Sequence, residues 1–547
     1  MKKIVIVGGV AGGMSTAARL RRLDEEVDIV VLERTGYVSF ANCGLPYYLG
    51  QEIEKFDDLV LQSPETLFAR FRLDVRVLHE VTGIDPVAQT VSGINLKTEE
   101  KFELPYHQLV LSVGAQPIKP PIPGLELPGV FTLRNLEDTA TIEHWIESKT
   151  PRQAVVVGGG YIGLEMAEQL HRRGLQVHLV DAAPQTLPPF DPEMAELVHR
   201  ELEKNEVELH LNSPLKRIEQ QAGGLVGKVV AGEARISADL VILGLGVRPD
   251  TALAKAAGLE LGGRGIQVND RMQTSVPNIW AVGDAIEVLN PISGEQVLIA
   301  LGGPANRQGR IVANNICGIE DRYNGTIGTA ILRVFDLQVG ATGLKEAQLQ
   351  QAGLPYEALY LHPKHHAGYY PGAESIAIKF LFDPSTGKIY GAQAIGKAGV
   401  DKRIDVIATA ILAGMTANEL ADLELAYSPP FGAAKDPINL IGMMAENLSQ
   451  GLLKQIQWHQ LPDLDPASHF LLDVRSTGEV GQGTIEGSVH IPLSELRDRL
   501  DEIPKSKEIV VFCQSGQRSY FASRLLALNG FQVKNLSGAY LTYQSKP

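Results

Sequence analysis

Residues 3–20 read KIVIVGGVAGGMSTAARL, and residues 153–170 read QAVVVGGGYIGLEMAEQL. Each stretch predicts a short buried strand, a glycine-rich turn and a helix that begins at the turn. In the second stretch Gly158, Gly160 and Gly163 complete the pattern G-x-G-x-x-G, whereas the first has Val10 at the middle position. Such a turn places backbone N–H groups and a helix N-terminus where a pyrophosphate can bind. The two stretches therefore decide the fold: they predict two Rossmann-like units.

Each unit also ends its next strand in an acidic residue. VDIVVLER supplies Glu33 and LQVHLVDA supplies Asp181, at about the distance expected for a carboxylate that binds a ribose. A tight strand-to-helix connection explains either turn alone, but the pair with both acids favours two dinucleotide sites. A carboxylate accepts the ribose 2′-hydroxyl and repels a 2′-phosphate, so Asp181 favours NADH over NADPH, a preference that nearby Arg172 and Arg173 moderate.

Three further apolar strands end in glycine turns: LVLSVGAQP (109–117), VILGLGVRPD (241–250) and TSVPNIWAVGDA (274–285). Asp284 in the last of these resembles the aspartate of the second flavin fingerprint, which binds the ribityl chain. With a second Rossmann unit inserted into the first, the chain resembles the two-dinucleotide flavoprotein disulfide reductases. The resemblance implies that the first unit carries FAD and the inserted unit carries the nicotinamide.

Composition narrows the class of protein. The chain has 547 residues, 44% hydrophobic and 21% charged, which is ordinary for a multidomain globular enzyme. Its formal net charge of −14 argues against a general nucleic-acid role. No stretch reaches the roughly 18 apolar residues that span a bilayer. Cys43, Cys317 and Cys513 have neither a disulfide framework nor zinc-ligand spacing, so we expect no metal site and a cytoplasmic protein with reduced thiols.

Cys43 lies in SFANCGLPYYLG (39–50), a segment that matches the single-cysteine branch of these flavoproteins. Where many relatives carry C-x4-C, position 48 is Tyr. Without a resolving partner, Cys43 can store an oxidising equivalent only as a mixed disulfide, a persulfide or a sulfenic acid. A buried structural cysteine is the alternative, and the flavin context favours a nucleophile.

The branch includes coenzyme A-disulfide reductases, NADH oxidases and NADH peroxidases. Peroxidases of the branch have a histidine on the first helix, where this chain has Ser15, Arg19 and Arg22. The two arginines are one turn apart and suit coenzyme A phosphates, although spacing alone fits a solvated basic helix face equally well. At the position of a family lysine after LFAR (67–70), this chain has Phe71 followed by Arg72, which leaves the diphosphate contacts open.

Two later segments strengthen the likeness to coenzyme A-disulfide reductases. AYSPPFGAAKDPINLIG (426–442) resembles the segment that supplies a tyrosine near the flavin thiol and a lysine at the coenzyme A site, here Tyr427 and Lys435. HHAGYYPGA (365–373) resembles the source of a second tyrosine, Tyr369 or Tyr370. In that family the segment belongs to a dimerisation domain, so the resemblance implies a homodimer in which Tyr427 and Lys435 act across the interface.

The chain changes character after residue 448. FLLDVRSTGEV (470–480), GSVHIPLSEL (487–496) and EIVVFCQSGQRSYFASRLLALNGF (508–531) resemble a rhodanese domain. Cys513 is placed at a helix N-terminus, where successive N–H groups and Arg518 stabilise anionic sulfur. A C-x5-R loop cradles phosphate, whereas the C-x4-R spacing here suits transferable sulfane sulfur. An inactive module is the alternative, but an inactive copy is expected to lack the cysteine.

We therefore predict an α/β protein with two Rossmann-like dinucleotide-binding domains, an α+β dimerisation domain and a C-terminal α/β rhodanese domain. The predicted boundaries are 1–112 with 248–322 for FAD, 113–247 for NADH, 323–445 for dimerisation, 446–455 for a linker and 456–547 for rhodanese.

The candidate residues fall into four groups. The catalytic set is Cys43, Cys513, Tyr427, Tyr369, Tyr370, Arg518 and Asn42. The FAD set is Gly8, Gly9, Val10, Ala11, Gly12, Gly13, Glu33, Arg34, Asn42, Cys43, Val81, Gly114, Gly283, Asp284 and Ala285. The NADH set is Gly158, Gly160, Tyr161, Ile162, Gly163, Asp181 and Gly246. The coenzyme A set is Ser15, Arg19, Arg22, Ser39, Asn42, Phe71, Arg72, Asn306 and Lys435.

The resemblance is strongest to coenzyme A-disulfide reductase/rhodanese fusions of the persulfide-reducing kind. It implies reduction of persulfides, polysulfides and coenzyme A persulfide or disulfide by NADH through FAD and Cys43, with release of hydrosulfide or a thiol. Two other classes stay open. An oxidase or peroxidase would use a Cys43 sulfenate, and a non-reductive sulfur carrier would use Cys513 without NADH.

Overall fold

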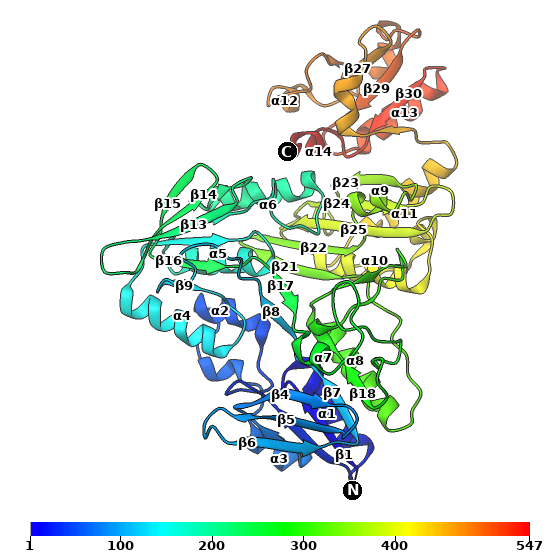
Figure 1. Cartoon of the computed structure of the whole chain (residues 1–547). Coiled ribbons are helices and arrows are strands. Elements are labelled where there is room, and N and C mark those ends of the chain that lie inside the picture. The colour runs from blue at the N-terminus through cyan, green and yellow to red at the C-terminus, as the bar shows by residue number, and fades with distance from the viewer. Residues whose placement is uncertain (1) are drawn as a thin grey trace. The chain divides into compact units, whose positions relative to one another are not determined.

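The computed structural model describes residues 2–547, which form two compact units. One unit holds the chain up to Pro184 together with Glu206–Thr326, and the other holds Gln185–Asn205 and Ile327–Pro547. Figure 1 labels the elements of both, and each unit is described separately below. Among the described residues, no helix is long and apolar enough to cross a membrane.

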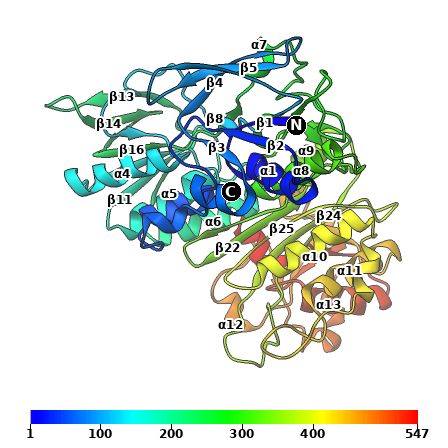
Figure 2. The same cartoon turned by 90° about the horizontal axis from the view of Figure 1, so that it is seen from below.

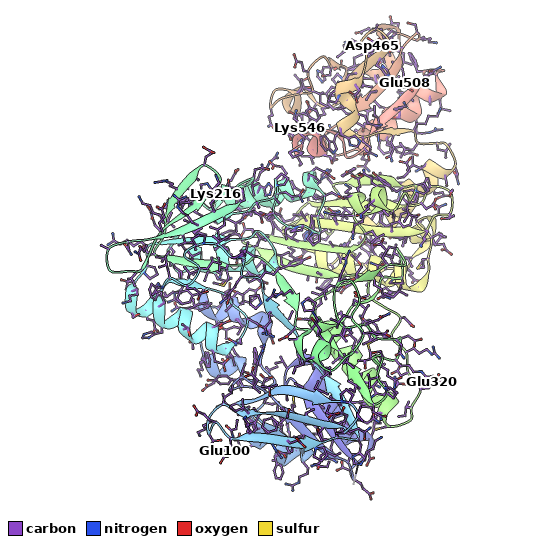
Figure 3. The ribbon with its side chains drawn as sticks, in the orientation of Figure 1. Glu100, Lys216, Glu320, Asp465, Glu508 and Lys546 are labelled. Atoms are coloured by element: carbon purple, nitrogen blue, oxygen red, sulfur yellow. The ribbon has the colours of Figure 1, made fainter. Side chains whose placement is uncertain are left out.

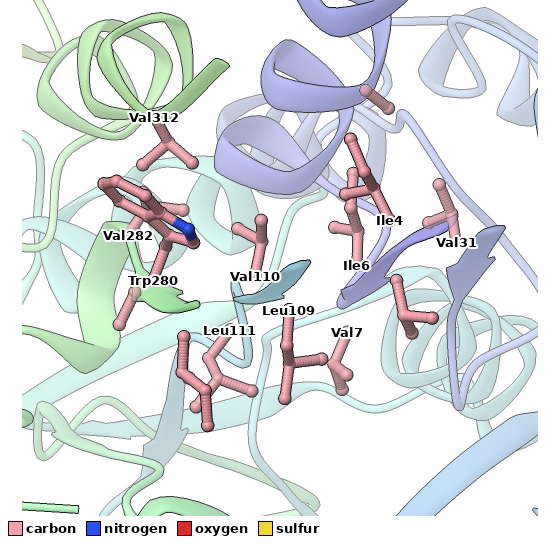
Figure 4. Close-up of a cluster of buried hydrophobic side chains, with 14 of the residues drawn as sticks. Ile4, Ile6, Val7, Val31, Leu109, Val110, Leu111, Trp280, Val282 and Val312 are labelled. Carbon is pink, nitrogen blue, oxygen red and sulfur yellow. The ribbon is translucent and has the colours of Figure 1, made fainter. Parts of the chain in front are cut away.

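The first unit begins with a parallel five-stranded sheet in the order β18-β7-β1-β2-β3. Its strands have near-continuous apolar runs such as KIVIV because helices cover both faces of a parallel sheet. The core of this sheet includes Ile4, Ile6, Val110 and Trp280 (Figure 4). The elements are β1 Lys3–Val7, α1 Ala11–Leu23, β2 Asp28–Leu32, β3 Asp74–Arg76, β7 Gln108–Leu111, β18 Ile279–Ala281 and α8 Gly302–Ile316.

A second parallel sheet in the same unit has the order β12-β11-β10-β16-β9. It repeats the topology of the first, with a helix starting directly after its central strand. Its elements are β9 Val130–Phe131, α4 Leu136–Lys149, β10 Gln153–Val157, α5 Tyr161–Arg172, β11 Gln176–Val180, β12 Glu208–His210 and β16 Leu240–Leu243. Two Rossmann-like sheets are thus present, as the paired glycine turns predict.

Smaller elements complete the first unit. Two antiparallel three-stranded sheets are formed by β4 His79–Asp85, β5 Thr90–Asn95 and β6 Lys101–Pro105, and by β13 Leu215–Gln220, β14 Val226–Ala231 and β15 Ala234–Ser237. Two strand pairs are β8 Ala115–Pro117 with β17 Val247–Pro249, and β19 Val288–Leu289 with β20 Gln296–Val297. The short helices are η1 Asn42–Gly44, α2 Leu45–Leu49, η2 Phe56–Leu59, α3 Pro64–Phe71, α7 Ala252–Ala256 and η3 Gly283–Ala285.

The second unit is built on an antiparallel sheet in the order β21-β22-β25-β24-β23. Helix α10 lies along this sheet, as Figure 2 shows, and its apolar face packs on β22 and β25. The elements are β21 Ala330–Val334, β22 Leu337–Gly343, α9 Glu346–Gln351, β23 Glu357–Leu361, β24 Ile376–Phe382, β25 Ile389–Gly396, α10 Val400–Ala413, η4 Asn418–Asp422 and α11 Pro437–Ser449.

A buried lysine ties a further helix, α6 Pro192–Lys204, to this sheet. The Nζ atom of Lys379 lies 2.8 Å from Asp191, 2.6 Å from Glu193 and 2.9 Å from Glu346. Burial opposes the charge of Lys379, but Tyr360 and the three carboxylates raise its pKa, so the ammonium is retained. Residues 185–205, which follow β11 in the sequence, therefore group with the second unit.

The C-terminal domain of the second unit is a parallel sheet in the order β26-β30-β29-β27-β28. Its charged side chains include Asp465 and Glu508, which Figure 3 labels. The elements are β26 Gln455–Ile456, η5 Trp458–Asp463, β27 His469–Asp473, α12 Thr477–Val480, β28 Val489–His490, η6 Leu496–Asp498, η7 Leu500–Glu502, β29 Glu508–Phe512, α13 Gln517–Leu528, β30 Val533–Leu536 and α14 Ala539–Gln544.

This domain packs directly on strand β23 of the neighbouring sheet. The Tyr360 backbone N–H donates to Ser537 Oγ at 3.3 Å, and Gln455 Nε2 donates to the Ala358 carbonyl at 3.0 Å. Just after β23, His362 Nε2 lies 2.8 Å from Thr542 Oγ1 on α14. The two domains of this unit are thus held together by polar contacts from β26, from Ser537 just after β30, and from α14.

Candidate active sites

The two glycine turns adopt the same geometry. Gly8 and Gly158 have φ of 103° and 108°, a conformation that glycine adopts without strain. A Cβ atom on Gly13 or Gly163 would collide with the carbonyl oxygen of Gly8 or Gly158, respectively. Helix and strand therefore approach closely only because glycine occupies these positions. Beyond its own helix and chain neighbours, no atom of residues 2–547 lies within 4 Å of a Cβ added to Gly160, which leaves the helix end open to a ligand.

The two acidic residues occupy matching positions beside these turns. Glu33 Oε2 accepts the Gly9 N–H at 2.8 Å, and Asp181 Oδ2 accepts the Gly159 N–H at 2.6 Å. Each carboxylate therefore lies next to the backbone that would receive a pyrophosphate. The arrangement suits a dinucleotide whose ribose hydroxyls donate to the acid.

Asp284 lies in η3, at the end of β18. Gly283 has φ of 78°, and its N–H donates to Gln308 Oε1 on α8 at 2.7 Å. Burial raises the pKa of the Asp284 carboxyl, while the charge of Arg134 opposes the shift. Within residues 2–547, no group donates a hydrogen bond to this half-buried carboxyl, so it fits a ligand that supplies hydroxyl donors, such as the ribityl chain of a flavin.

Sequence patterns did not identify Arg134 or Gln308 as parts of this site. Arg134 Nη1 donates to Gln116 Oε1 at 2.7 Å, and burial followed by the nearby charge of Arg34 lowers the pKa of its guanidinium. Neither residue belongs to a glycine motif, and only the fold brings them near Asp284. The predicted Arg34 pairs instead with Asp250 at 3.6 Å.

The other predicted dinucleotide residues lie on the same frameworks. Gly114 and Gly246 have positive φ angles of 70° and 91° in the turns that follow β7 and β16. Val81 is buried in β4, and Ala285 is buried in η3.

Cys43 lies in η1, immediately before α2. The residue is exposed and forms no disulfide. Partial desolvation, the charge of Glu165 on α5 and the charge of Asp284 together raise the pKa of its thiol. Ser39, four residues earlier, has φ of 48°, and Asn42 is exposed beside the thiol. The thiol is thus exposed and feels the negative charges of Glu165 and Asp284.

The predicted coenzyme A helix presents two of its polar residues to α8. Ser15 Oγ donates to Asn306 Oδ1, and Arg19 Nε donates to Asn314 Oδ1 at 3.0 Å. Arg22 is exposed one turn beyond Arg19. Ser15 and Asn306, two residues of the predicted coenzyme A set, are therefore neighbours.

Phe71 and Arg72 end helix α3. The Phe71 side chain packs against the core, and its carbonyl accepts a hydrogen bond from Arg21 Nε at 2.8 Å. Arg72 is exposed, has φ of 48° and places its guanidinium 5.1 Å from the Phe68 ring centroid. Phe71 is therefore a packing residue, whereas the exposed guanidinium of Arg72 can reach a phosphate.

The three predicted catalytic tyrosines, Tyr369, Tyr370 and Tyr427, are exposed. The hydroxyls of Tyr369 and Tyr427 are 3.4 Å apart, and this hydrogen bond raises the pKa of Tyr369. Tyr370 packs edge-on against His366. Lys435 is exposed beside Asp436, whose carboxylate pairs with buried Arg403 at 2.7 Å and caps α11. The 365–373 and 426–442 segments thus meet at one surface.

Cys513 lies at the end of β29, fully buried, and the Gly516 N–H donates to its Sγ at 3.1 Å. Gly516 has φ of 106°, which turns the loop into α13. Helix α14 braces this loop, because the Tyr540 N–H donates to the Cys513 carbonyl and the Leu541 N–H to the Gln514 carbonyl, both at 3.0 Å. Arg518 is paired with Glu479, a partner that the sequence motif did not reveal.

Three family models cover these regions in order. "Pyridine nucleotide-disulphide oxidoreductase" matches residues 2–309, its dimerisation domain matches residues 329–436, and "Rhodanese-like domain" matches residues 453–546. The chain belongs to the pyridine nucleotide-disulphide oxidoreductase family. As a member it is a flavin-dependent oxidoreductase that binds FAD and NAD(H), which confirms the predicted class, fold and dinucleotides.

Two solved structures are similar to almost the whole chain. A structure described as reduced Bacillus anthracis CoADR-RHD is 47% identical, with a TM-score of 0.97, and the match covers 100% of this chain and 98% of that one. A NAD-dependent persulfide reductase from A. fulgidus is 37% identical, with a TM-score of 0.93 and coverage of 99% and 100%.

Two curated relatives match about four fifths of this chain. A coenzyme A disulfide reductase of Staphylococcus haemolyticus is 34% identical over 452 residues, which is 82% of this chain and 100% of that protein. An NADH oxidase of Methanocaldococcus jannaschii is 37% identical over 444 residues, which is 80% of this chain and 97% of that protein.

Proposed function

We propose that this protein uses NADH and FAD to reduce persulfides, polysulfides and coenzyme A persulfide or disulfide, and that its rhodanese domain handles sulfane sulfur. The observation that carries the proposal is the presence, in one chain, of an exposed free thiol at Cys43 and a second free cysteine, Cys513, whose sulfur accepts the Gly516 N–H in a loop that leads into α13. The similarity to a persulfide reductase over 99% of the chain, rhodanese domain included, supports it.

Cys43 acts as the nucleophile in this proposal. Its thiolate attacks the sulfur chain of R–S–SH, and the S–S bond breaks. Attack on the inner sulfur leaves a Cys43 mixed disulfide and releases hydrosulfide, whereas attack on the outer sulfur leaves a Cys43 persulfide and releases the thiol R–SH. The flavin and the nicotinamide, when bound, supply the two electrons that restore the Cys43 thiolate. The balance is R–S–SH + NADH + H⁺ → R–SH + H₂S + NAD⁺.

The protein must help Cys43 to ionise, because its surroundings raise the pKa of the thiol. In a homodimer we assign this task to Tyr427 of the partner subunit, whose hydroxyl can donate a hydrogen bond to the thiolate. The hydrogen bond between the Tyr369 and Tyr427 hydroxyls supports a joint role for these two residues. Lys435 would reach the coenzyme A site from the same surface.

Coenzyme A is the ligand that we assign to the basic helix. Ser15, Arg19 and Arg22, with Asn306 and Arg72, would bind its phosphates, and its thiol would extend toward Cys43. A bound coenzyme A also offers a carrier for sulfur between Cys43 and Cys513, since its pantetheine arm is flexible. Free thiols suit a reducing compartment, and the cytoplasm is the location that we propose.

The test is anaerobic consumption of NADH with coenzyme A persulfide, coenzyme A disulfide and hydrogen peroxide in parallel, with hydrosulfide measured. The proposal predicts rapid turnover with the persulfide and one hydrosulfide released for each NADH. Turnover with peroxide alone would instead establish a Cys43 sulfenate enzyme, which the 37% identity to an NADH oxidase makes the second candidate. Persulfide transfer from Cys513 without NADH consumption would establish a sulfur carrier.

A further inference from the structure

Two histidines and a glutamate meet at one edge of the second Rossmann-like sheet, where β12 is the outermost strand. In the parallel pairing of β11 with β12, His178 lies beside Glu208, and Val180 lies beside His210. Alternate residues of a strand share a face, so Glu208 and His210 lie on the same face of β12. The register thus gathers His178, Glu208 and His210, called the edge cluster below, on one face of the sheet.

The ligand atoms of the edge cluster have the spacing of a metal site. His178 Nδ1 is 3.2 Å from His210 Nε2 and 3.3 Å from Glu208 Oε2. One ligand atom can be taken from each residue so that all three lie within 4.8 Å of one another. In a tetrahedral zinc site with bonds of about 2.0 to 2.1 Å, the ligand atoms are about 3.3 to 3.4 Å apart. The three side chains can therefore form one face of such a tetrahedron with little movement.

The protonation of the two imidazoles permits this arrangement. A neutral imidazole carries one proton, which either ring nitrogen can hold. With the protons on His178 Nε2 and His210 Nδ1, the two nitrogens that face each other both present a lone pair. The same pair of nitrogens forms an ordinary hydrogen bond when one of them keeps its proton, so the site can exist with or without an ion.

The carboxylate of the edge cluster is oriented from behind. Glu208 Oε1 accepts a hydrogen bond from Gln176 Nε2 at 2.9 Å, and Gln176 Oε1 accepts one from Gln153 Nε2 at 3.1 Å. This chain of amides fixes one carboxylate oxygen, while the other oxygen lies next to His178. Hydrogen bonds of this kind orient the ligands of metal sites and raise their affinity.

Exposure and ligand type indicate which ion fits. The His178 side chain is 10% exposed and the Glu208 side chain 53%, so an ion can enter from the solvent side of Glu208. Two imidazoles and one carboxylate suit Zn²⁺ and similar late first-row ions, whereas Mg²⁺ and Ca²⁺ prefer oxygen ligands. The expectation of no metal site rests on the spacing of the cysteines, and the edge cluster contains no cysteine.

We propose that His178, Glu208 and His210 bind a zinc-class divalent cation that joins the edge strand β12 to β11. The inference goes beyond the proposed function and does not rest on it. The cation would lie beside the predicted NADH site, because the Asp181 N–H donates to the His210 carbonyl at 3.0 Å. Its binding therefore steadies the two strands that position Asp181.

The test is hydrogen–deuterium exchange of the full-length holoenzyme with increasing zinc chloride, read in the peptides covering residues 176–183 and 206–213. At a zinc concentration one hundred times the dissociation constant, exchange through openings that break the site should be about a hundredfold slower. Magnesium chloride at the same concentration should slow it less than twofold. Because the readout is local, zinc bound by cysteines elsewhere in the chain does not produce it.

Variants show whether the effect passes through the edge cluster. His210→Gln should leave less than a twofold slowing at the same zinc concentration, and Glu208→Gln should weaken zinc binding at least about tenfold. Gln176→Ala keeps all three ligands and should weaken binding about tenfold, because it removes the hydrogen bond that orients Glu208. His469→Gln is the matched control: this histidine also pairs with a glutamate, Glu508 at 3.5 Å, and its loss should leave the wild-type response unchanged.

Three results would overturn the proposal. The first is unchanged exchange in the wild type with zinc up to about 1 mM. The second is a zinc response in His210→Gln and Glu208→Gln equal to that of the wild type, and the third is an equal response to magnesium. Glu208 is exposed and His210 partly so, and the melting temperature of each variant without zinc confirms that it is folded.

Discussion

Protonation of His362 should loosen the contact between the rhodanese domain and the dimerisation domain. His362 Nε2 is 2.8 Å from the Thr542 hydroxyl on α14. Burial lowers the pKa of the His362 imidazole from 6.5 to about 4, although a hydrogen bond with the Gly538 backbone acts in the opposite direction. Because α14 also donates the Tyr540 N–H to the Cys513 carbonyl, the same helix seats the sulfur-transfer loop.

The sign and size of the effect follow from linkage. The unfolded or undocked imidazole binds a proton near pH 6.5, whereas the docked one does so only near pH 4, so the open state takes up more protons between these values. The stabilisation is complete above pH 6.5 and is lost as the pH falls. With a pKa shift of this size, the free energy that favours docking falls by about 2 kcal/mol between pH 7 and pH 5, and by about 3 kcal/mol between pH 7 and pH 4.

Hydrogen–deuterium exchange of the peptide covering residues 537–546 measures this opening directly. After correction for intrinsic exchange rates, the free energy of opening should fall by about 2 kcal/mol from pH 7 to pH 5 in the wild type. His362→Gln should lower the pH 7 value and remove most of the pH dependence, whereas exposed His459→Gln should change neither. An equal pH dependence in His362→Gln would refute the reasoning.

Three other substitutions test the reductase and transfer sites. Asp181→Ser should narrow the preference for NADH over NADPH in steady-state kinetics, because it removes the carboxylate that repels a 2′-phosphate; equal use of both by the wild type would contradict the assignment. Tyr427→Phe should lower persulfide turnover by about tenfold to a hundredfold, as expected for a group that assists ionisation without attacking; turnover as low as in a Cys43 variant would make Tyr427 indispensable. Cys513→Ser should leave NADH-driven reduction of small persulfides within about twofold and abolish transfer from protein-bound or elemental sulfur. If it abolished both, the two cysteines would have to form one obligatory relay.

The parts of the fold that sequence predicted best are those in which a local pattern has a single physical explanation. Gly8 and Gly158 require positive φ, and Gly13 and Gly163 require close helix–strand contact, so the two turns identify two Rossmann-like sheets. The acidic residue at the end of the next strand, such as Glu33, follows each turn at a nearly constant number of residues, because the helix and the strand between them have similar lengths in every Rossmann-like unit.

The parts that sequence could not predict depend on long-range contacts. The partner of Arg518 is Glu479, which is 39 residues earlier, and no motif indicates that pairing. Helix α6 groups with the second unit through Lys379, which is 186 residues after Glu193. Nor could spacing alone show that Phe71 packs into the core while Arg72 stays exposed.

The central claim is that Cys43 cleaves the sulfur substrate, and one anaerobic comparison tests it most directly. Wild type and Cys43→Ser are mixed with NADH and then with coenzyme A persulfide, while flavin absorbance and released hydrosulfide are followed. The account predicts that NADH bleaches the flavin in both proteins, because hydride transfer needs no thiol, and that hydrosulfide release falls by at least about a thousandfold in Cys43→Ser. Hydrosulfide release by Cys43→Ser at a tenth or more of the wild-type rate would contradict it.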